Sequence, residues 1–107
     1  MADELMNHIK SMIDKNKIVI FMKGTPNLPM CGFSAATIEL FNRIGVPYET
    51  VNVLENPQIR DGIKAFSNWP TIPQVYVGGK FIGGCDIVHE MDGRGELEPL
   101  VKSAVAA

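Results

Sequence analysis

The sequence predicts an α/β fold with a four-stranded mixed sheet flanked by helices. Through the first two thirds of the chain, short apolar runs rich in β-branched residues alternate with segments of helical spacing. Two strands joined by a crossover helix are expected to run parallel, because a short turn cannot return the chain to the same direction. Farther along, Gly78-Gly79 separates two short strand patterns, which predicts an antiparallel hairpin. A sheet with both kinds of pairing is mixed.

The first half of the chain predicts a helix followed by two strand-helix pairs. Apolar side chains recur at helical spacing over residues 3–15, and residues 18–22 form an uninterrupted apolar run, typical of a strand covered on both faces. After a loop that contains prolines, helical spacing continues over residues 35–44. Residues 48–53 alternate as a strand does, and residues 56–66 follow as a helix with a proline near its start.

The second half predicts the hairpin and two closing helices. The hairpin strands are residues 74–77 and 80–82, on either side of the glycine pair. Helical patterns then cover about residues 87–91 and 96–105, with glycines between them as the break. No internal repeat or linker interrupts this order.

Length and composition indicate one domain that spans residues 1–107. A chain of this length buries one core of ordinary size but not two independent cores. Ten Lys and Arg residues oppose twelve Asp and Glu residues, and no block of like charges occurs, so we expect no nucleic-acid partner. No apolar run approaches the roughly 18 residues of a membrane span, and the mixed, acidic start is unlike a signal peptide. We therefore expect no membrane association.

The cysteine content indicates thiol chemistry in a reducing compartment. Two cysteines, Cys31 and Cys85, are too few for the disulfide framework of a small secreted domain, so we expect a cytoplasmic location. Neither belongs to a Cys-x-x-Cys motif, and His8 and His89 have no ligand partner at zinc spacing. We interpret both histidines as structural or surface residues.

Cys31 is the candidate nucleophile, since it lies at or just before the N-terminus of a predicted helix. The helix dipole and the free backbone N–H groups there stabilise a thiolate over a thiol. The alternative is a small apolar residue that fills the core, because cysteine is among the most buried residue types. Pro29 before the cysteine and Gly32 after it leave little bulk around the sulfur, which favours the functional interpretation.

Two cations are candidates to bind a carboxylate near this thiol. Lys23 ends the first strand, and ligands gather outside the carboxyl ends of the parallel strands in an open α/β sheet. A cation there can pair with a substrate carboxylate and lower the pKa of the thiol. Arg60 can clamp a carboxylate through two hydrogen bonds. The alternative for both is a solvated surface side chain.

The segment Ile72-Pro73 and the segment Gly83–Asp86 are candidate backbone contacts for a ligand. Pro73 at the start of a strand removes no ladder donor and can hold Ile72 with its backbone groups turned outward. Gly83 and Gly84 allow a ligand to approach the backbone closely. Asp86 either caps the following helix or meets an ammonium group, and capping is the commoner use of aspartate there.

Four separated motifs give the chain a family resemblance that covers essentially its whole length. In their order and spacing, these motifs resemble those of the monothiol glutaredoxins of the Cys-Gly-Phe-Ser type. The motifs are Lys23-Gly24-Thr25-Pro26, Cys31-Gly32-Phe33-Ser34, Trp69-Pro70-Thr71-Ile72-Pro73 and Gly83-Gly84-Cys85-Asp86.

The resemblance implies a thioredoxin-like fold with a glutathione site. It implies that Pro73 is cis and that Ile72 offers its backbone to the cysteinyl part of glutathione. It further implies that Lys23 and Arg60 face the glycine carboxylate. The γ-glutamyl end would then be held at the helix start, by Cys85 and Asp86. Glutathione has two carboxylates and one ammonium group, so such a site would complement its charges.

The resemblance also implies a two-iron, two-sulfur cluster as cargo, with Cys31 as the protein's metal ligand. Such a cluster commonly takes four thiolates. In the implied arrangement, a homodimer holds it through two protein thiolates and two glutathiones, and the chain is a monomer without it. The residues alone also permit Cys31 and Cys85 of two chains to supply all four ligands. BolA-like proteins and cluster-accepting proteins are the implied partners.

A competing interpretation is a glutathione-dependent thiol-disulfide oxidoreductase. Ser34 stands where a dithiol site would have its second cysteine, so an internal Cys-x-x-Cys disulfide cannot form. Cys31 would instead attack a mixed disulfide between glutathione and a protein, and external glutathione would resolve it. We rank this activity second to cluster transfer and expect it to be weak.

We also expect Cys85 to resolve an oxidised Cys31, by forming a disulfide bond with it that is strained and reducible.

Overall fold

The computed structural model describes residues 2–107, and this part of the chain contains five helices and four strands. In chain order the elements are α1 (Ala2–Lys15), β1 (Ile18–Met22), α2 (Gly32–Ile44), β2 (Glu49–Asn52), α3 (Pro57–Ser67), β3 (Gln74–Val77), β4 (Lys80–Gly83), α4 (Cys85–Gly93) and α5 (Leu97–Ala106).

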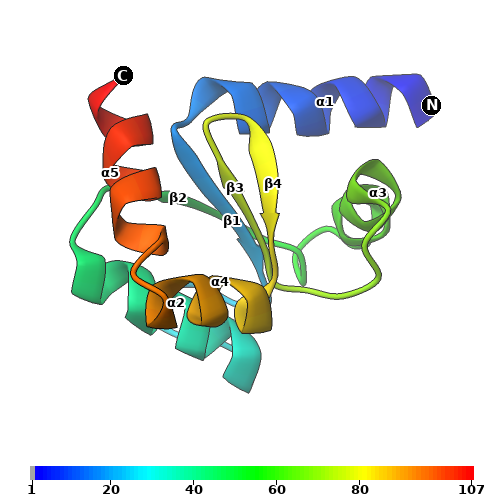
Figure 1. Cartoon of the computed structure of the whole chain (residues 1–107). Helices are drawn as coiled ribbons and strands as arrows, with labels where there is room; N and C mark the ends of the chain where they lie inside the picture. Colours follow the sequence, from blue (N-terminus) through cyan, green and yellow to red (C-terminus); the bar gives the residue numbers. More distant parts are fainter. Residues whose placement is uncertain (1) are drawn as a thin grey trace.

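The strands form one mixed sheet in the order β2-β1-β3-β4 (Figure 1). β1 and β2 are parallel, with Val19 opposite Glu49, because helix α2 carries the chain back between them. β3 runs antiparallel to β1 and pairs with β4 through the hairpin at Gly78-Gly79. The predicted fold class, its parallel pair and its hairpin are all confirmed.

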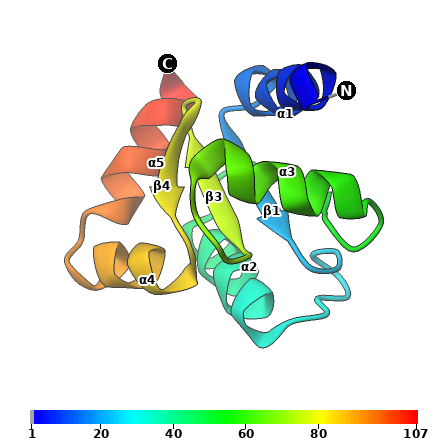
Figure 2. The same cartoon turned by 90° about the vertical axis from the view of Figure 1, so that its right-hand side faces the viewer.

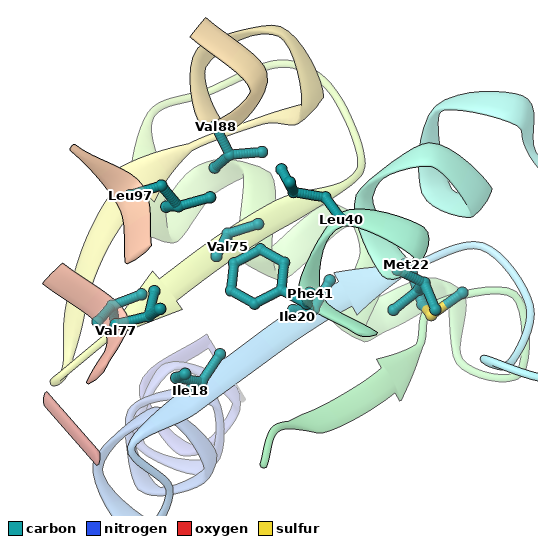
Figure 3. Close-up of a cluster of buried hydrophobic side chains, with 11 residues drawn as sticks. Ile18, Ile20, Met22, Leu40, Phe41, Val75, Val77, Val88 and Leu97 are labelled. Atoms are coloured by element: carbon teal, nitrogen blue, oxygen red, sulfur yellow. The ribbon is translucent and has the colours of Figure 1, made fainter. Parts of the chain in front are cut away.

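Helices cover both faces of the sheet (Figure 2), which makes a three-layer arrangement. Every residue of β1 is buried, because its alternate side chains enter the cores on opposite faces. Helices α1 and α3 pack on one face, around Phe21 and Tyr76. Helices α2, α4 and α5 pack on the other, around Ile20 and Phe41 (Figure 3). The predicted coverage of this strand on both faces is therefore confirmed.

Helix α4 begins earlier than the sequence predicted, whereas α2 begins where the prediction of Cys31 at or just before a helix N-terminus placed it. Helix α2 starts at Gly32, which makes Cys31 its extended N-cap residue. Helix α4 starts at Cys85 instead of Ile87, since the Val88 N–H donates to the Gly84 carbonyl (3.1 Å) and so closes the first turn. The glycines before α4 suggested a longer loop, but Gly84 serves as the N-cap. Each cysteine thus lies at the N-terminal end of a helix.

None of the helices in residues 2–107 is both long enough and apolar enough to cross a membrane.

Candidate functional site

The loop between β1 and α2 brings Cys31 to the carboxyl end of β1. The Met30 N–H donates to the Lys23 carbonyl (2.9 Å), which folds the loop back on the strand. Gly24 has φ 94°, and a Cβ there would lie 2.5 Å from the Leu28 carbonyl oxygen, so only glycine fits this return. The Gly24 N–H also donates to Asn52 Oδ1 (2.9 Å), which ties the loop to the end of β2.

The Cys31 thiol has its pKa lowered below its ordinary value, chiefly by the backbone N–H of Ser34 in the first turn of α2. Partial burial of the sulfur opposes this effect. The Phe33 N–H, the Ser34 hydroxyl and, least, the charge of Lys23 also lower the pKa. The direction agrees with the expectation that helix N–H groups and a cation at Lys23 lower the pKa of this thiol.

Ser34 has a structural task besides its effect on the thiol. Its side chain is fully buried, and its Oγ accepts a hydrogen bond from the Lys23 N–H (3.1 Å). The residue therefore connects the first turn of α2 to the end of β1, under the sulfur of Cys31. No sequence pattern predicts this connection.

A cavity of about 520 Å³ opens beside the thiol. Among the predicted site residues, Lys23, Cys31, Ile72, Cys85 and Asp86 line it. The remaining wall comes from Phe33, Lys64, Gly84, Ile87 and the loop around Trp69–Pro73. The structure thus brings together segments from the ends of β1, α3 and β4, as the family resemblance implied.

The cations at this cavity differ from the predicted pair. Arg60 does not line it, because its guanidinium points to Asp61, with 3.3 Å between Nε and Oδ1. Lys64, one turn farther along α3, lines the cavity instead. Lys23 does line it but is half-buried, not the solvated surface lysine expected by default. The contact of Arg60 with a glutathione carboxylate stays a prediction, and it requires the side chain to leave Asp61.

The start of α4 also departs from the commoner expectation. Gly84, not Asp86, is the N-cap, and no side chain caps this helix, so the capping role proposed for Asp86 is wrong. Asp86 lies in the first turn and is one of the residues that line the cavity. Gly84 is glycine for a reason inside the protein, since a Cβ there would lie 3.1 Å from the Pro73 carbonyl oxygen. This close packing holds the start of α4 against the proline loop.

The peptide bond between Ile72 and Pro73 is cis, as the resemblance implied. Ile72 is buried. The hydrogen bonds that hold its loop in place come from Gln74, which the sequence did not predict. Gln74 Nε2 donates to the carbonyls of Trp69 (3.2 Å) and Thr71 (3.3 Å). The Tyr76 hydroxyl in turn donates to Gln74 Oε1 (3.1 Å).

This network fixes one wall of the cavity from inside the sheet. Gln74 is completely buried, so its amide is a rigid attachment for the loop. The only sign of this network in the sequence is a lone glutamine at the start of an apolar strand. Strand periodicity does not show which groups accept hydrogen bonds from its amide.

The rim around Cys31 is apolar. Leu28, Met30 and Phe33 are exposed, each by more than 60% of its surface. Exposed large apolar side chains that gather beside a reactive thiol make a surface on which another polypeptide can dock.

A complete metal site is not present within residues 2–107 of a single chain. No three His, Cys, Asp or Glu side chains in this range converge closely enough to hold a metal ion.

The fold and this site together define a class: thioredoxin-like proteins that act through one activated cysteine at a helix N-terminus, beside a cis-proline loop. A family model described as Glutaredoxin matches residues 18–82. A monothiol glutaredoxin of Synechocystis sp. is 47% identical over 107 residues, which cover all of both chains. The chain belongs to the glutaredoxin family, within its monothiol branch.

Two solved structures share the fold closely. The holo form of glutaredoxin C1 from Populus tremula x tremuloides has a TM-score of 0.89 at 30% identity, covering 99% of this chain and 94% of that one. A buckwheat glutaredoxin-glutathione complex has a TM-score of 0.86 at 26% identity, covering 96% and 92%. The thioredoxin-like fold implied by the motifs is thereby confirmed.

Proposed function

We propose that this chain binds glutathione in the cavity beside Cys31 and carries a two-iron, two-sulfur cluster between two copies of itself for transfer to other proteins. The observation that carries this proposal is one activated thiol at the mouth of a cavity whose charges complement glutathione. The glutaredoxin from buckwheat was solved as a glutathione complex, which supports the first half of the proposal by similarity.

The charges of the cavity suit a tripeptide with carboxylates at both ends. Lys23 and Lys64 offer cations to the glycine carboxylate. The first turn of α4 offers free N–H groups to the γ-glutamyl carboxylate, and Asp86 lies beside it for the ammonium group. The volume is within the usual range of small-ligand sites, about 300 to 1,000 Å³.

The number of ligands that the cluster needs supports a cluster shared between two chains. A cluster with two irons commonly takes four thiolates. Cys31 offers one from each chain, so two chains and two glutathiones complete the set without any further protein ligand. Because bound glutathione dissociates by mass action, such a cargo would be easy to release to an acceptor protein. BolA-like proteins are proposed as additional partners on the strength of the motif resemblance.

Assembly of the cluster tests this proposal directly. Reduced protein supplied with iron, sulfide and glutathione should become a coloured dimer in analytical ultracentrifugation with absorbance detection. Removal of glutathione should return a colourless monomer. A cluster that stays on a monomer, or that assembles equally well without glutathione, would contradict the bridged dimer.

Matched controls identify the ligands. Cys31→Ser should abolish assembly, whereas Cys85→Ser should retain it, because glutathione supplies the other two thiolates. Loss of the cluster in Cys85→Ser would instead favour direct ligation by Cys85. S-methylglutathione, which keeps both carboxylates but has no free thiol, should not replace glutathione in assembly.

The activated thiol also supports the second candidate function, removal of glutathione from protein mixed disulfides. A lowered pKa makes Cys31 a nucleophile and a good leaving group in thiol-disulfide exchange. Turnover of a glutathionylated substrate, measured beside cluster assembly on the same preparation, ranks the two activities.

Both chemistries need free thiols, so we propose a reducing compartment, the cytoplasm in the simplest case.

A further inference from the structure

The loop before β3 is held by one amide whose hydrogen-bonding groups are all used inside the protein. Gln74 Nε2 donates to the carbonyls of Trp69 (3.2 Å) and Thr71 (3.3 Å), and Gln74 Oε1 accepts from the Tyr76 hydroxyl (3.1 Å). These three bonds occupy both N–H groups and the oxygen of the amide. A flipped amide would turn its oxygen toward two carbonyl oxygens, so the side chain has one favourable orientation.

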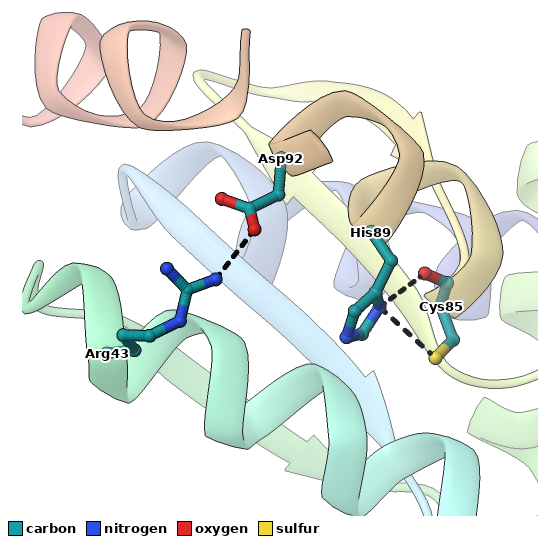
Figure 4. Close-up of polar contacts among 4 residues, drawn as sticks. All are labelled: Arg43, Cys85, His89 and Asp92. Atoms are coloured by element: carbon teal, nitrogen blue, oxygen red, sulfur yellow. Dashed lines mark hydrogen bonds and ion pairs between the residues drawn. The ribbon is translucent and has the colours of Figure 1, made fainter. Parts of the chain in front are cut away.

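Burial makes these hydrogen bonds costly to lose. Gln74 and Tyr76 are both buried, and a polar group that loses its partner there keeps its full desolvation penalty. The ion pair between Arg43 on α2 and Asp92 on α4 (2.6 Å) is a contrast, because it lies at the surface, where water replaces a lost partner (Figure 4). Loss of the Gln74 amide should therefore disturb its partners far more than loss of this ion pair.

The held segment has an easy way out of place. Its start is attached to α3, since the Trp69 N–H donates to the Lys64 carbonyl (3.1 Å) and to Ser67 Oγ (3.1 Å). The next two residues, Pro70 and Thr71, are exposed. Without the amide, the carbonyls that it binds would reach water by turning outward. That movement would carry the loop away from the cavity that it lines.

We propose that Gln74 is a positioning residue for glutathione, which holds the loop at Ile72 in the conformation that the ligand needs. Gln74 itself does not line the cavity, so it acts on the ligand only through the loop. This inference rests on the proposed binding of glutathione and names the buried residue on which the affinity depends. A loop that is correctly placed for only a fraction of the time raises the apparent dissociation constant by the inverse of that fraction.

The decisive variant is Gln74→Met, since methionine has a similar length and offers the loop no amide. We expect glutathione affinity, measured by isothermal titration calorimetry, to fall about tenfold, as it would if the loop were in place about a tenth of the time. The matched control is Val77→Ala, which removes apolar volume from the same strand on the opposite face of the sheet. It should lower the temperature of unfolding and leave the affinity unchanged.

A shorter ligand separates the loop from the cations. γ-Glutamylcysteine lacks the glycine carboxylate, so Lys64→Ala should weaken its binding far less than that of glutathione. Gln74→Met should weaken the binding of both ligands by the same factor, because the loop is expected to face the cysteinyl part that they share. A loss confined to glutathione would place the effect of Gln74 at the cations and overturn the proposal.

The single tryptophan of the chain reports on the loop without any ligand. Trp69 lines the cavity, its carbonyl accepts from Gln74, and its ring packs against Phe81 with 5.7 Å between the ring centroids. Acrylamide should quench its fluorescence more strongly in Gln74→Met than in the parent protein, and equally in Val77→Ala and the parent. If the parent protein binds no glutathione, the proposed function is wrong, and this quenching still shows whether Gln74 holds the loop.

Tyr76→Phe provides a second test that does not depend on the folding of Gln74→Met. It keeps both bonds from the amide to the loop and removes only the donor to Gln74 Oε1, so its affinity should fall, but less than tenfold. Unchanged quenching in Gln74→Met, an affinity loss no greater than that of Val77→Ala, or parental affinity in Tyr76→Phe would overturn the proposal.

Discussion

Cys31 owes its reactivity to backbone groups more than to any neighbouring charge. Because the N–H of Ser34 is the largest influence on its pKa, we predict an alkylation rate whose half-maximum lies clearly below the free-thiol value of about 8.5. Iodoacetamide labelling against pH, with peptide mapping, measures this. Lys23→Ala should move that half-maximum only slightly upward, since the lysine charge is the smallest contribution. A half-maximum at the free-thiol value would contradict the activation described above.

The positions of three cations around the cavity predict how much each contributes to glutathione binding. Lys23→Ala and Lys64→Ala should each weaken glutathione binding about tenfold, since each removes a charge-assisted hydrogen bond worth ~1.4 kcal/mol. Arg60→Ala should have a smaller effect, because this guanidinium points to Asp61. Isothermal titration calorimetry measures all three.

Thermal unfolding is the control for these variants. It should change little, because the lysines line a cavity and do not fill a core. A large loss of stability in Lys23→Ala with unchanged binding would remove its proposed role. An Arg60→Ala defect as large as that of Lys64→Ala would show that the arginine turns toward the ligand.

Helix α3 carries Lys64 to the cavity, and the cap at its N-terminus stabilises it. Asn56 caps it, accepting hydrogen bonds at Oδ1 from the N–H groups of Gln58 (3.0 Å) and Ile59 (3.2 Å). Asn56→Ala should therefore lower the free energy of unfolding by about 1 kcal/mol in urea denaturation. Asn7→Ala, the same change inside α1, should be neutral or slightly stabilising, because alanine has the higher helix propensity. Equal losses in both variants would contradict the capping role.

At the scale of the whole molecule, the Tyr76–Gln74 pair links the sheet to the loop that lines the cavity. Burial raises the pKa of Tyr76 to about 12. A pKa raised in the folded state stabilises the fold below the unfolded value of about 10, and this stability is lost as pH rises toward 12. Wild-type protein should thus lose about 2 kcal/mol over that range from this residue alone.

Two phenylalanine variants isolate this tyrosine, and denaturant unfolding across that pH range measures them. Tyr76→Phe should remove its share of the alkaline loss, while at neutral pH it should cost about 1 to 3 kcal/mol, because Gln74 Oε1 loses its donor. Tyr48→Phe should alter the alkaline slope less, since Tyr48 is only partly buried and its hydroxyl bonds to the exposed Asn42. An unchanged alkaline slope in Tyr76→Phe would rule out this tyrosine as its source.

Local signals in the sequence are sufficient to predict the order of elements and the mixed sheet. Hydrophobic period, glycine pairs and prolines are local signals, and they correctly predicted β1 residue by residue and the hairpin between β3 and β4. Residue type and place in the chain selected Cys31, Lys23, Ile72 and Asp86, the family resemblance added Cys85, and the folded molecule brings all five to one cavity.

Which side chains of those segments face one another depends on how the elements pack. Arg60 and Lys64 lie on the same helix one turn apart, and the packing of α3 against the sheet determines that the lysine lines the cavity. The bonds of Gln74 to the loop, and of Ser34 to the end of β1, join residues whose partners no periodicity identifies. Sequence patterns report which face of an element is buried, whereas the direction of a single polar group depends on how the packed elements meet.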